Sequence, residues 1–152
     1  MRLLMLALLV ALAVVGCGGS SDGAASSLQG GVYTYELTEQ YLVENGISAE
    51  QAARESGKHQ TILREDGAFT DSWTTANGSS GSCSGTYEEG DGSRVTFKWS
   101  TGCFGDWAMT YSVDGATVTW SDHEALEPAS DEDQKVTEVF NGVPWTRIGG
   151  VS

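Results

Sequence analysis

Basic residues are scarce in this chain, and the shortage excludes one large class of partner. Eight Lys and Arg residues stand against 21 Asp and Glu residues, which gives a formal net charge of −13. A surface of this sign repels the phosphate backbone of nucleic acids and anionic lipid headgroups. We therefore expect no nucleic-acid partner and interpret the charge as a solubility feature of a monomeric protein.

Histidine is scarcer still, since the chain has only His59 and His123. A zinc site needs three or four converging ligands, and adjacent residues such as Asp122-His123-Glu124 do not converge as helical i, i+4 pairs do. The run Asp131–Asp133 lacks the Asp-x-Asp-x-Asp-Gly frame of a calcium loop and is interpreted as a solvated loop. Neither histidine has an identifiable nucleophile. We expect no metal, no cofactor and no catalytic residues, so the chain is predicted not to be an enzyme.

The apolar run from Leu3 to Val15 is too short to span a bilayer comfortably, and with Arg2 before it the run is typical of a secretory signal. It ends in Val14-Val15-Gly16-Cys17, which resembles the lipobox of bacterial lipoproteins. The resemblance implies cleavage before Cys17 and acylation of its sulfur and new amino group. The alternative is an ordinary secretory signal with a chance cysteine.

These features predict the domain organisation and the location of the protein. Residues 1–16 are predicted to be a signal peptide, and residues 17–29, rich in Gly, Ser and Ala, a lipidated and flexible tether. Residues 30–152 remain for one folded domain. We expect this domain in the cell envelope, outside the cytoplasm, attached to a membrane through the lipid on Cys17.

Cysteine is used sparingly, with three residues in all. With Cys17 assigned to lipid, Cys83 and Cys103 form an even pair in an oxidising compartment and are predicted to form a disulfide. The segment from Gly81 to Gly85 matches the G-x-nucleophile-x-G elbow of α/β hydrolases, but its flanks lack the strand and helix that this elbow requires.

The segment from Cys83 to Trp120 organises the rest of the chain. Thr-Tyr, Asp-Gly and Val-Thr occur in this order from Thr86 to Trp99 and again from Thr110 to Trp120. Another Asp-Gly pair, Asp66-Gly67, precedes an alternating run. Asp-Gly between alternating runs is a strong hairpin signal, because a type I′ turn needs φ > 0 at both central positions. The pattern predicts a meander of hairpins.

Alternating apolar and polar residues predict eight strands, at residues 32–37, 58–65, 68–74, 85–89, 94–100, 107–113, 117–121 and 144–148. Two short helices are predicted at residues 38–44 and 49–56, after strand one. Loops are predicted at residues 75–82 and 122–133, and residues 134–140 fit helix spacing slightly better than strand spacing. Eight antiparallel strands remove their exposed edges by closing. The fold class is therefore all-β, an eight-stranded antiparallel up-and-down barrel.

The sequence Gly31-Val32-Tyr33 before strand one and Arg147 in the last strand resemble the opening and closing motifs of lipocalin-like (calycin-type) barrels. The pattern spans Gly30 to Ile148, and lipocalins carry Trp where this chain has Tyr33. The chain is also similar to exported bacterial proteins of unknown function that end in Pro-Trp-Thr-Arg. The lipocalin resemblance implies a small ligand inside the barrel.

Aromatic residues and one aspartate are the candidate lining of that interior. Aromatic side chains line apolar ligand sites, but they also simply fill barrels, and both interpretations stay open. An inward Asp71 would need a partner such as Arg64, Lys98 or Arg147. The candidates are Tyr33, Tyr35, Phe69, Asp71, Trp73, Phe97, Trp99, Trp107, Tyr111 and Trp120.

Trp145 and Arg147 are predicted to close the barrel. Trp145 should be buried against strand one, and the Arg147 guanidinium should stack on an aromatic ring and bind carbonyls of the helical segment after strand one. The leading functional hypothesis is a lipid-anchored binding protein that holds a small apolar or amphipathic ligand. The alternative is an envelope structural or interaction lipoprotein with a filled barrel and no small ligand.

The Cys17→Ser variant tests the lipid anchor. Without the thiol no diacylglycerol is attached, and the methylenes that hold the protein in the bilayer, each contributing about 0.8 kcal/mol, are lost. We expect the variant to stay uncleaved or to be released as soluble material, as measured by fractionation and immunoblotting. Normal processing and normal membrane retention of the variant would contradict the lipoprotein prediction.

Overall fold

The computed structural model describes residues 27–100, 103 and 105–151. The predicted signal peptide, Cys17 and most of the predicted tether lie outside these residues. Within the described ranges, no helix combines the length and the apolar character needed to cross a membrane.

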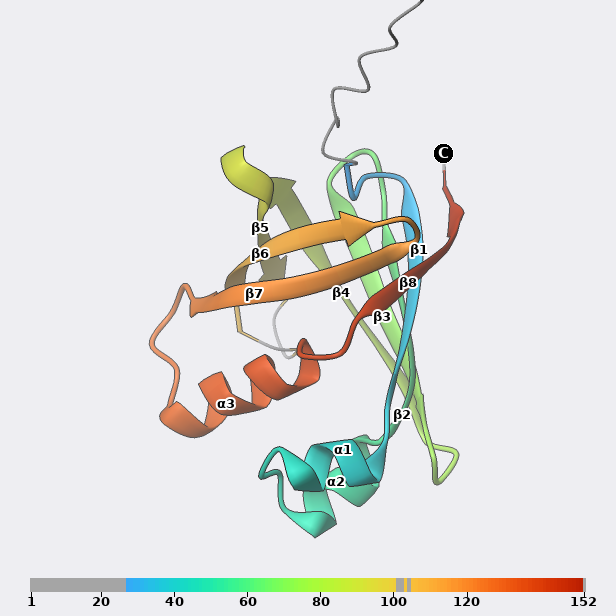
Figure 1. The fold of residues 1–152 in the computed structure, drawn as a ribbon, viewed down its shortest axis with the longest axis vertical. Helices are drawn as coiled ribbons and strands as arrows, with labels where there is room; N and C mark the ends of the chain where they lie inside the picture. The colour runs from blue at the N-terminus through green and yellow to red at the C-terminus, as the bar shows by residue number, and fades with distance from the viewer. Residues whose placement is uncertain (1–26, 101–102, 104, 152) are drawn as a thin grey trace, which may run out of the picture.

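Eight strands form one closed barrel in which each strand is antiparallel to its neighbours and the last strand pairs with the first (Figure 1). The sequence-based prediction of a closed eight-stranded antiparallel barrel is confirmed. The strands are β1 (Gly31–Leu37), β2 (Gly57–Leu63), β3 (Ala68–Thr75), β4 (Ser80–Glu89), β5 (Arg94–Trp99), β6 (Trp107–Asp114), β7 (Thr117–Ala125) and β8 (Trp145–Gly150).

Two short helices, α1 (Glu39–Glu44) and α2 (Ala49–Glu55), follow β1 as predicted. The side chains of Thr38 and Ser48 accept hydrogen bonds from backbone N–H groups in the first turn of each helix, so each residue caps its helix. The α-helices α1, α2 and α3 (Asp131–Phe140) lie at one end of the barrel, which we call the helical end (Figure 1).

A third helix, α3 (Asp131–Phe140), corrects the prediction of a loop over residues 122–133. Ser130 and Asp133 form a capping box, so Asp131 and Asp133 belong to a first helical turn, where negative charge is favourable. The solvated-loop interpretation of the acidic run is therefore wrong. The helical alternative for residues 134–140 is correct.

The Asp-Gly pairs do lie at hairpin connections, but the type I′ explanation is wrong. Gly67, Gly92 and Gly115 have positive φ values of 80°, 68° and 59°. Among the described residues other than glycine, only Ser93 and Asp122 have positive φ, so the aspartates of these turns do not. Only one residue of each pair needs the left-handed region, which glycine enters at little cost. A short 3₁₀ turn, η1 (Asp91–Ser93), makes the β4–β5 connection.

Two strands extend well beyond their predicted bounds. β4 begins at Ser80, five residues before the predicted Gly85, because a Ser- and Gly-rich stretch pairs fully with β3. β7 continues past Ser121 to Ala125, although Asp122 has a φ of 51° and the β6–β7 register shifts nearby. Such a bulge lets a strand continue while its twist changes.

The described residues form two apolar clusters. The barrel cluster contains buried side chains from every strand, and the helical cluster packs Leu37, Leu42, Ile47 and Ala52 against Val139 of α3. Tyr35 contacts both clusters. The helices are therefore part of the packed structure at the helical end and do not form a separate domain.

Pairing of β8 with β1 closes the barrel, and Trp145 lies at this junction. Its ring stacks on Tyr35 at 5.0 Å and lies 6.2 Å from Tyr33, and the residue is 5% exposed. Burial of Trp145 against strand one is confirmed.

Arg147 matches its prediction only in part. Its guanidinium lies 5.9 Å from the Tyr33 ring centroid, as expected. Nη2 donates to the carbonyl oxygens of Gln29 and Gly30, each at 3.4 Å, and not to carbonyls of the helical segment. The reason is that Arg147 lies near the start of β1, opposite the helical end, where the chain enters the barrel.

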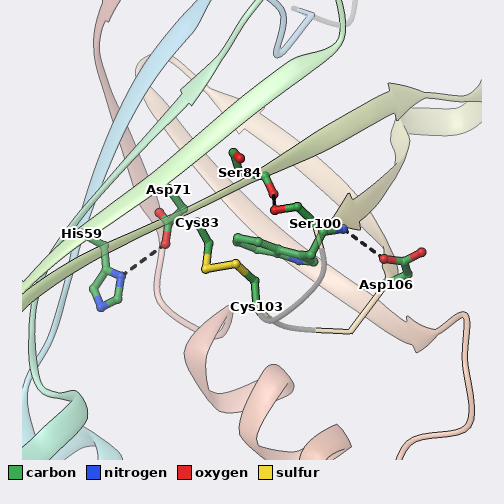
Figure 2. Close-up of a disulfide and its surroundings, with 8 residues drawn as sticks. His59, Asp71, Cys83, Ser84, Ser100, Cys103 and Asp106 are labelled. Atoms are coloured by element: carbon green, nitrogen blue, oxygen red, sulfur yellow. Dashed lines mark hydrogen bonds and ion pairs between the residues drawn. A yellow bond between two sulfur atoms is a disulfide. The ribbon is translucent and has the colours of Figure 1, made fainter.

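Cys83 and Cys103 form the predicted disulfide, 20 residues apart in sequence (Figure 2). The bond joins β4 to the connection between β5 and β6. A closed loop of this length stabilises the fold by about 3 kcal/mol, mainly because it restricts the unfolded chain.

Truncation of Trp145 tests the closure of the barrel. The Trp145→Ala variant should lose about 3–5 kcal/mol of unfolding free energy, because a buried indole at the β1–β8 junction leaves a cavity. Urea denaturation followed by circular dichroism measures the loss. The matched control is Ile148→Ala on the same strand, where the side chain is 56% exposed and little change is expected. Equal losses in the two variants would contradict this account.

Candidate functional site

A cavity of about 70 Å³, which we call the inner cavity, lies inside the barrel at its helical end. Its walls come from the strands and its cover comes from α3. Inward positions of a strand recur every second residue, so the lining residues of each strand share one face. The aromatic lining residues that the strands contribute are Tyr35, Phe69, Phe97, Trp99, Trp107 and Trp145.

Three polar side chains, His59, Thr61 and Asp71, line the same cavity. His59 and Thr61 are two residues apart on β2, and Thr61 lies opposite Asp71 of β3 in the antiparallel register. The Thr61 hydroxyl donates to Asp71 Oδ1 at 2.7 Å, and His59 Nδ1 lies 3.7 Å from Asp71 Oδ2. Figure 2 shows the His59 and Asp71 side chains directed toward one another, with Asp71 near Cys83.

The polar groups of this trio are deeply buried and incompletely paired. Asp71 is 4% exposed and His59 is 7% exposed. Neither ring nitrogen of His59 has a hydrogen-bond partner, and the buried indole N–H of Trp145 also has none. A buried donor or acceptor without a hydrogen-bond partner destabilises the folded state by about 1–3 kcal/mol. A small polar molecule in the space that these groups line would supply the missing partners.

An aromatic ring stacks on His59, and other rings of the lining pack against one another. Tyr35 stacks on His59 with ring centroids 4.6 Å apart, and Phe69 meets Trp99 edge to face at 4.7 Å. Burial raises the pKa of the Tyr35 phenol well above its ordinary value of 10, and the negative charge of Asp71 acts in the same direction. Tyr35 is therefore neutral at physiological pH and contributes an aromatic face and a hydroxyl to the cavity, without a charge.

Helix α3 covers the inner cavity with Val136, Thr137, Phe140 and Asn141. The Tyr41 hydroxyl of α1 donates to the Val139 carbonyl oxygen at 3.0 Å, which links two helices of the helical end. Access to the cavity through this end therefore depends on the position of α3.

A second, wider space of about 330 Å³, which we call the outer cleft, lies beside the inner cavity. The two share Trp107, Val136 and Thr137. Three acidic residues, Asp106, Glu127 and Asp133, line the outer cleft. Together the two spaces reach the range of about 300–1,000 Å³ that is usual for small-molecule sites.

The structure divides the sequence-predicted lining residues into two groups. Tyr35, Phe69, Asp71, Phe97, Trp99 and Trp107 do line the inner cavity. Tyr33, Tyr111 and Trp120 lie in the barrel cluster and do not line it.

Each residue that lies away from the inner cavity has a structural reason to do so. The hydroxyl of Tyr33 donates to the Leu28 carbonyl oxygen at 2.9 Å, and that of Tyr111 donates to Glu89 Oε2 at 3.0 Å. Trp73 packs over Gly81 of β4, where an added Cβ would lie 2.5 Å from its Cζ2. These aromatic rings fill the barrel or cover a neighbouring strand.

The predicted basic partners of Asp71 are wrong. Arg64 donates to the Thr70 hydroxyl, Arg147 donates to backbone carbonyls, and Lys98 is exposed on β5. The actual neighbours, Thr61 and His59, are polar residues of β2 that do not stand out in the sequence, because Ile62 and Leu63 are the large apolar residues of this strand. The alternation of His59, Thr61 and Leu63 was the available signal, since Leu63 fixes which face of β2 turns inward.

Catalytic and metal chemistry find little support in this arrangement. The Thr61 hydroxyl donates to Asp71 and not to His59, so the trio does not form a nucleophile–base pair. Within the described residues, no group of three or more His, Cys, Asp or Glu side chains could hold a metal ion. Burial lowers the pKa of His123, although Glu138 and Asp122 oppose this shift.

No protein-family model, curated protein or solved structure matches this chain. A function for the chain therefore has to be inferred from the inner cavity and its surroundings.

Loss of the Thr61 hydroxyl tests the role assigned to it. Thr61→Val removes the donor to a buried carboxylate at nearly constant volume, and we expect a loss of about 1–3 kcal/mol in unfolding free energy at pH 7. Thr61→Ser is the matched control, because it keeps the hydroxyl and should retain most of the stability. Chemical denaturation measures both. A smaller loss for Val than for Ser would refute the proposed hydrogen bond.

Proposed function

We propose that this chain is a lipid-anchored, extracytoplasmic binding protein that holds a small amphipathic ligand in a lipocalin-like barrel. The observation that carries the proposal is the incompletely paired trio of His59, Thr61 and Asp71 inside a cavity whose strand walls are mainly aromatic. A barrel that only needed filling would be most stable with apolar residues at these positions, because buried charges cost more than they return unless they are fully paired.

The anchor and the location are part of the same proposal. The apolar run from Leu3 to Val15 and the lipobox-like Val14-Val15-Gly16-Cys17 support export and lipidation. The disulfide between Cys83 and Cys103 agrees with an oxidising compartment. The barrel architecture and the Gly31-Val32-Tyr33 opening support the lipocalin-like assignment.

Ligand size follows from the two spaces. At about 70 Å³ the inner cavity holds only a few non-hydrogen atoms, such as one polar head. The outer cleft of about 330 Å³ could take a short carbon body that leaves the barrel beside α3. The ligand of the proposal is therefore small, with one polar group and a short apolar part.

A second candidate function is an envelope structural or interaction protein without a small ligand. The observation that favours it is the small volume of the inner cavity, because aromatic side chains fill most of the barrel. In that case ordered water would satisfy the polar trio.

Native mass spectrometry of the full-length protein, purified from its own envelope, separates the two candidates. We expect a non-covalent small-molecule adduct that disappears under denaturing conditions. Thr137→Trp, which places an indole where α3 meets both spaces, should abolish the adduct. Gln134→Trp, at an exposed position of α3, is the matched control and should keep it.

The two variants must first show wild-type circular dichroism, so that loss of the adduct reports on the cavity. Wild-type protein without any adduct would contradict the binding function and favour the second candidate.

A further inference from the structure

We infer that the ligand is a small organic cation whose ammonium group lies against Asp71 and whose carbon atoms contact the aromatic wall. This inference rests on the proposed binding function and adds the chemical class of the ligand. The charges, partners and walls of the inner cavity each support it.

Charge is the first support. Asp71 is buried, and Lys and Arg are absent from the residues that line the inner cavity and the outer cleft in the described part of the chain. A carboxylate removed from water requires a positive charge or several hydrogen bonds. An anionic ligand would add repulsion inside the barrel, so it is disfavoured.

The existing partners of Asp71 leave room for one more. Thr61 supplies one hydrogen bond, to Oδ1. His59 Nδ1, at 3.7 Å from Oδ2, is within ion-pair distance but too far for a hydrogen bond. An ammonium group at this point could donate to Oδ2 and to an unpartnered imidazole nitrogen of His59, which accepts when the ring is neutral. It would thereby satisfy two of the buried groups at once.

The aromatic walls of the inner cavity provide a second kind of contact for a cation, the cation–π interaction. Tyr35, Phe69, Phe97, Trp99, Trp107 and Trp145 line the cavity, and the faces of such rings attract ammonium groups by about 0.5–2 kcal/mol each when water is excluded. An aromatic wall beside one carboxylate is the usual way to bind an amine, because the rings also accept its methylene groups.

The outer cleft, which lies beside the inner cavity, is also lined by negative charge. Asp106, Glu127 and Asp133 line the outer cleft, and the whole chain has a formal net charge of −13. A negative field at the entrance raises the local concentration of cations and their association rate. The proposed ammonium site does not include these acidic residues. Asp106 accepts from the backbone N–H of Trp99, and Asp133 belongs to the capping box of α3.

Three probes of equal chain length and different charge test the inference: butylammonium, 1-butanol and butyrate at pH 7. The processed protein, with its lipid anchor and the whole barrel domain, is labelled with ¹⁵N and kept in nonionic detergent. It is titrated with each probe, and the tryptophan indole N–H signals are followed by NMR. We expect butylammonium to bind at least about tenfold more tightly than 1-butanol, and butyrate to bind least.

Asp71→Asn should reduce the preference for butylammonium over butanol to below about threefold, while its fold is kept because a buried charge is removed. Asp114→Asn is the matched control. It makes the same change in net charge at an exposed Asp-Gly turn, where Asn-Gly is equally acceptable, and should keep the preference.

The outcomes separate this inference from the function on which it rests. If butanol or butyrate binds as tightly as butylammonium, the cation assignment is wrong and the binding function stands. If no probe binds but the native protein carries a neutral or anionic adduct, the cation assignment is again wrong and the binding function again stands. If no probe binds and the native protein carries no adduct, both proposals fail. A preference that survives in Asp71→Asn would also overturn the assignment.

Discussion

Pairing between the first and last strands is the constraint on which the rest of this structure depends. An open sheet of eight strands would expose two rows of unpaired backbone groups, and closure removes both. Trp145 packs across this junction, because its ring contacts Tyr33 and Tyr35 of β1 and lies 4.7 Å from Trp120 of β7. The backbone pairing of β7 with β8 is short, with two registered residue pairs. Side-chain packing therefore contributes more to the stability of the barrel between these two strands.

Closure also creates the conditions for the polar trio. Once the strands close, every second side chain points into a space that water enters only at the ends, and a carboxylate placed there loses its hydration. The protein tolerates Asp71 at the helical end, where Thr61 and His59 are within reach, and fills the rest of the interior with aromatic and aliphatic side chains. One end of the barrel is therefore a packed core, and the other holds under-paired polar groups beneath α3.

Much of the fold could be predicted from the sequence, because alternation and turn residues are local signals. The strands and the two helices after β1 follow from such signals, the closure follows from the need to remove two exposed edges, and the disulfide follows from the pair of cysteines that remains after Cys17. Helix α3 was harder, since its capping box was masked by an acidic run that resembles a loop. The partners of Asp71 could not be deduced, because they depend on the β2–β3 register, and the cover that α3 provides depends on how a helix packs across the end of a closed sheet.

The two described chain ends lie together, opposite the helices: the Val151 N–H donates to the Gly30 carbonyl oxygen at 2.8 Å (Figure 1). With the anchor of the proposed function, this arrangement determines which end of the barrel lies nearer to the membrane. An anchor joined to the chain before Ser27 would hold the barrel by its entry end and turn α3 and the two spaces beside it toward the surrounding medium. A tag or fusion partner added after Val151 would lie on the membrane side, so it would leave the opposite face accessible to small molecules.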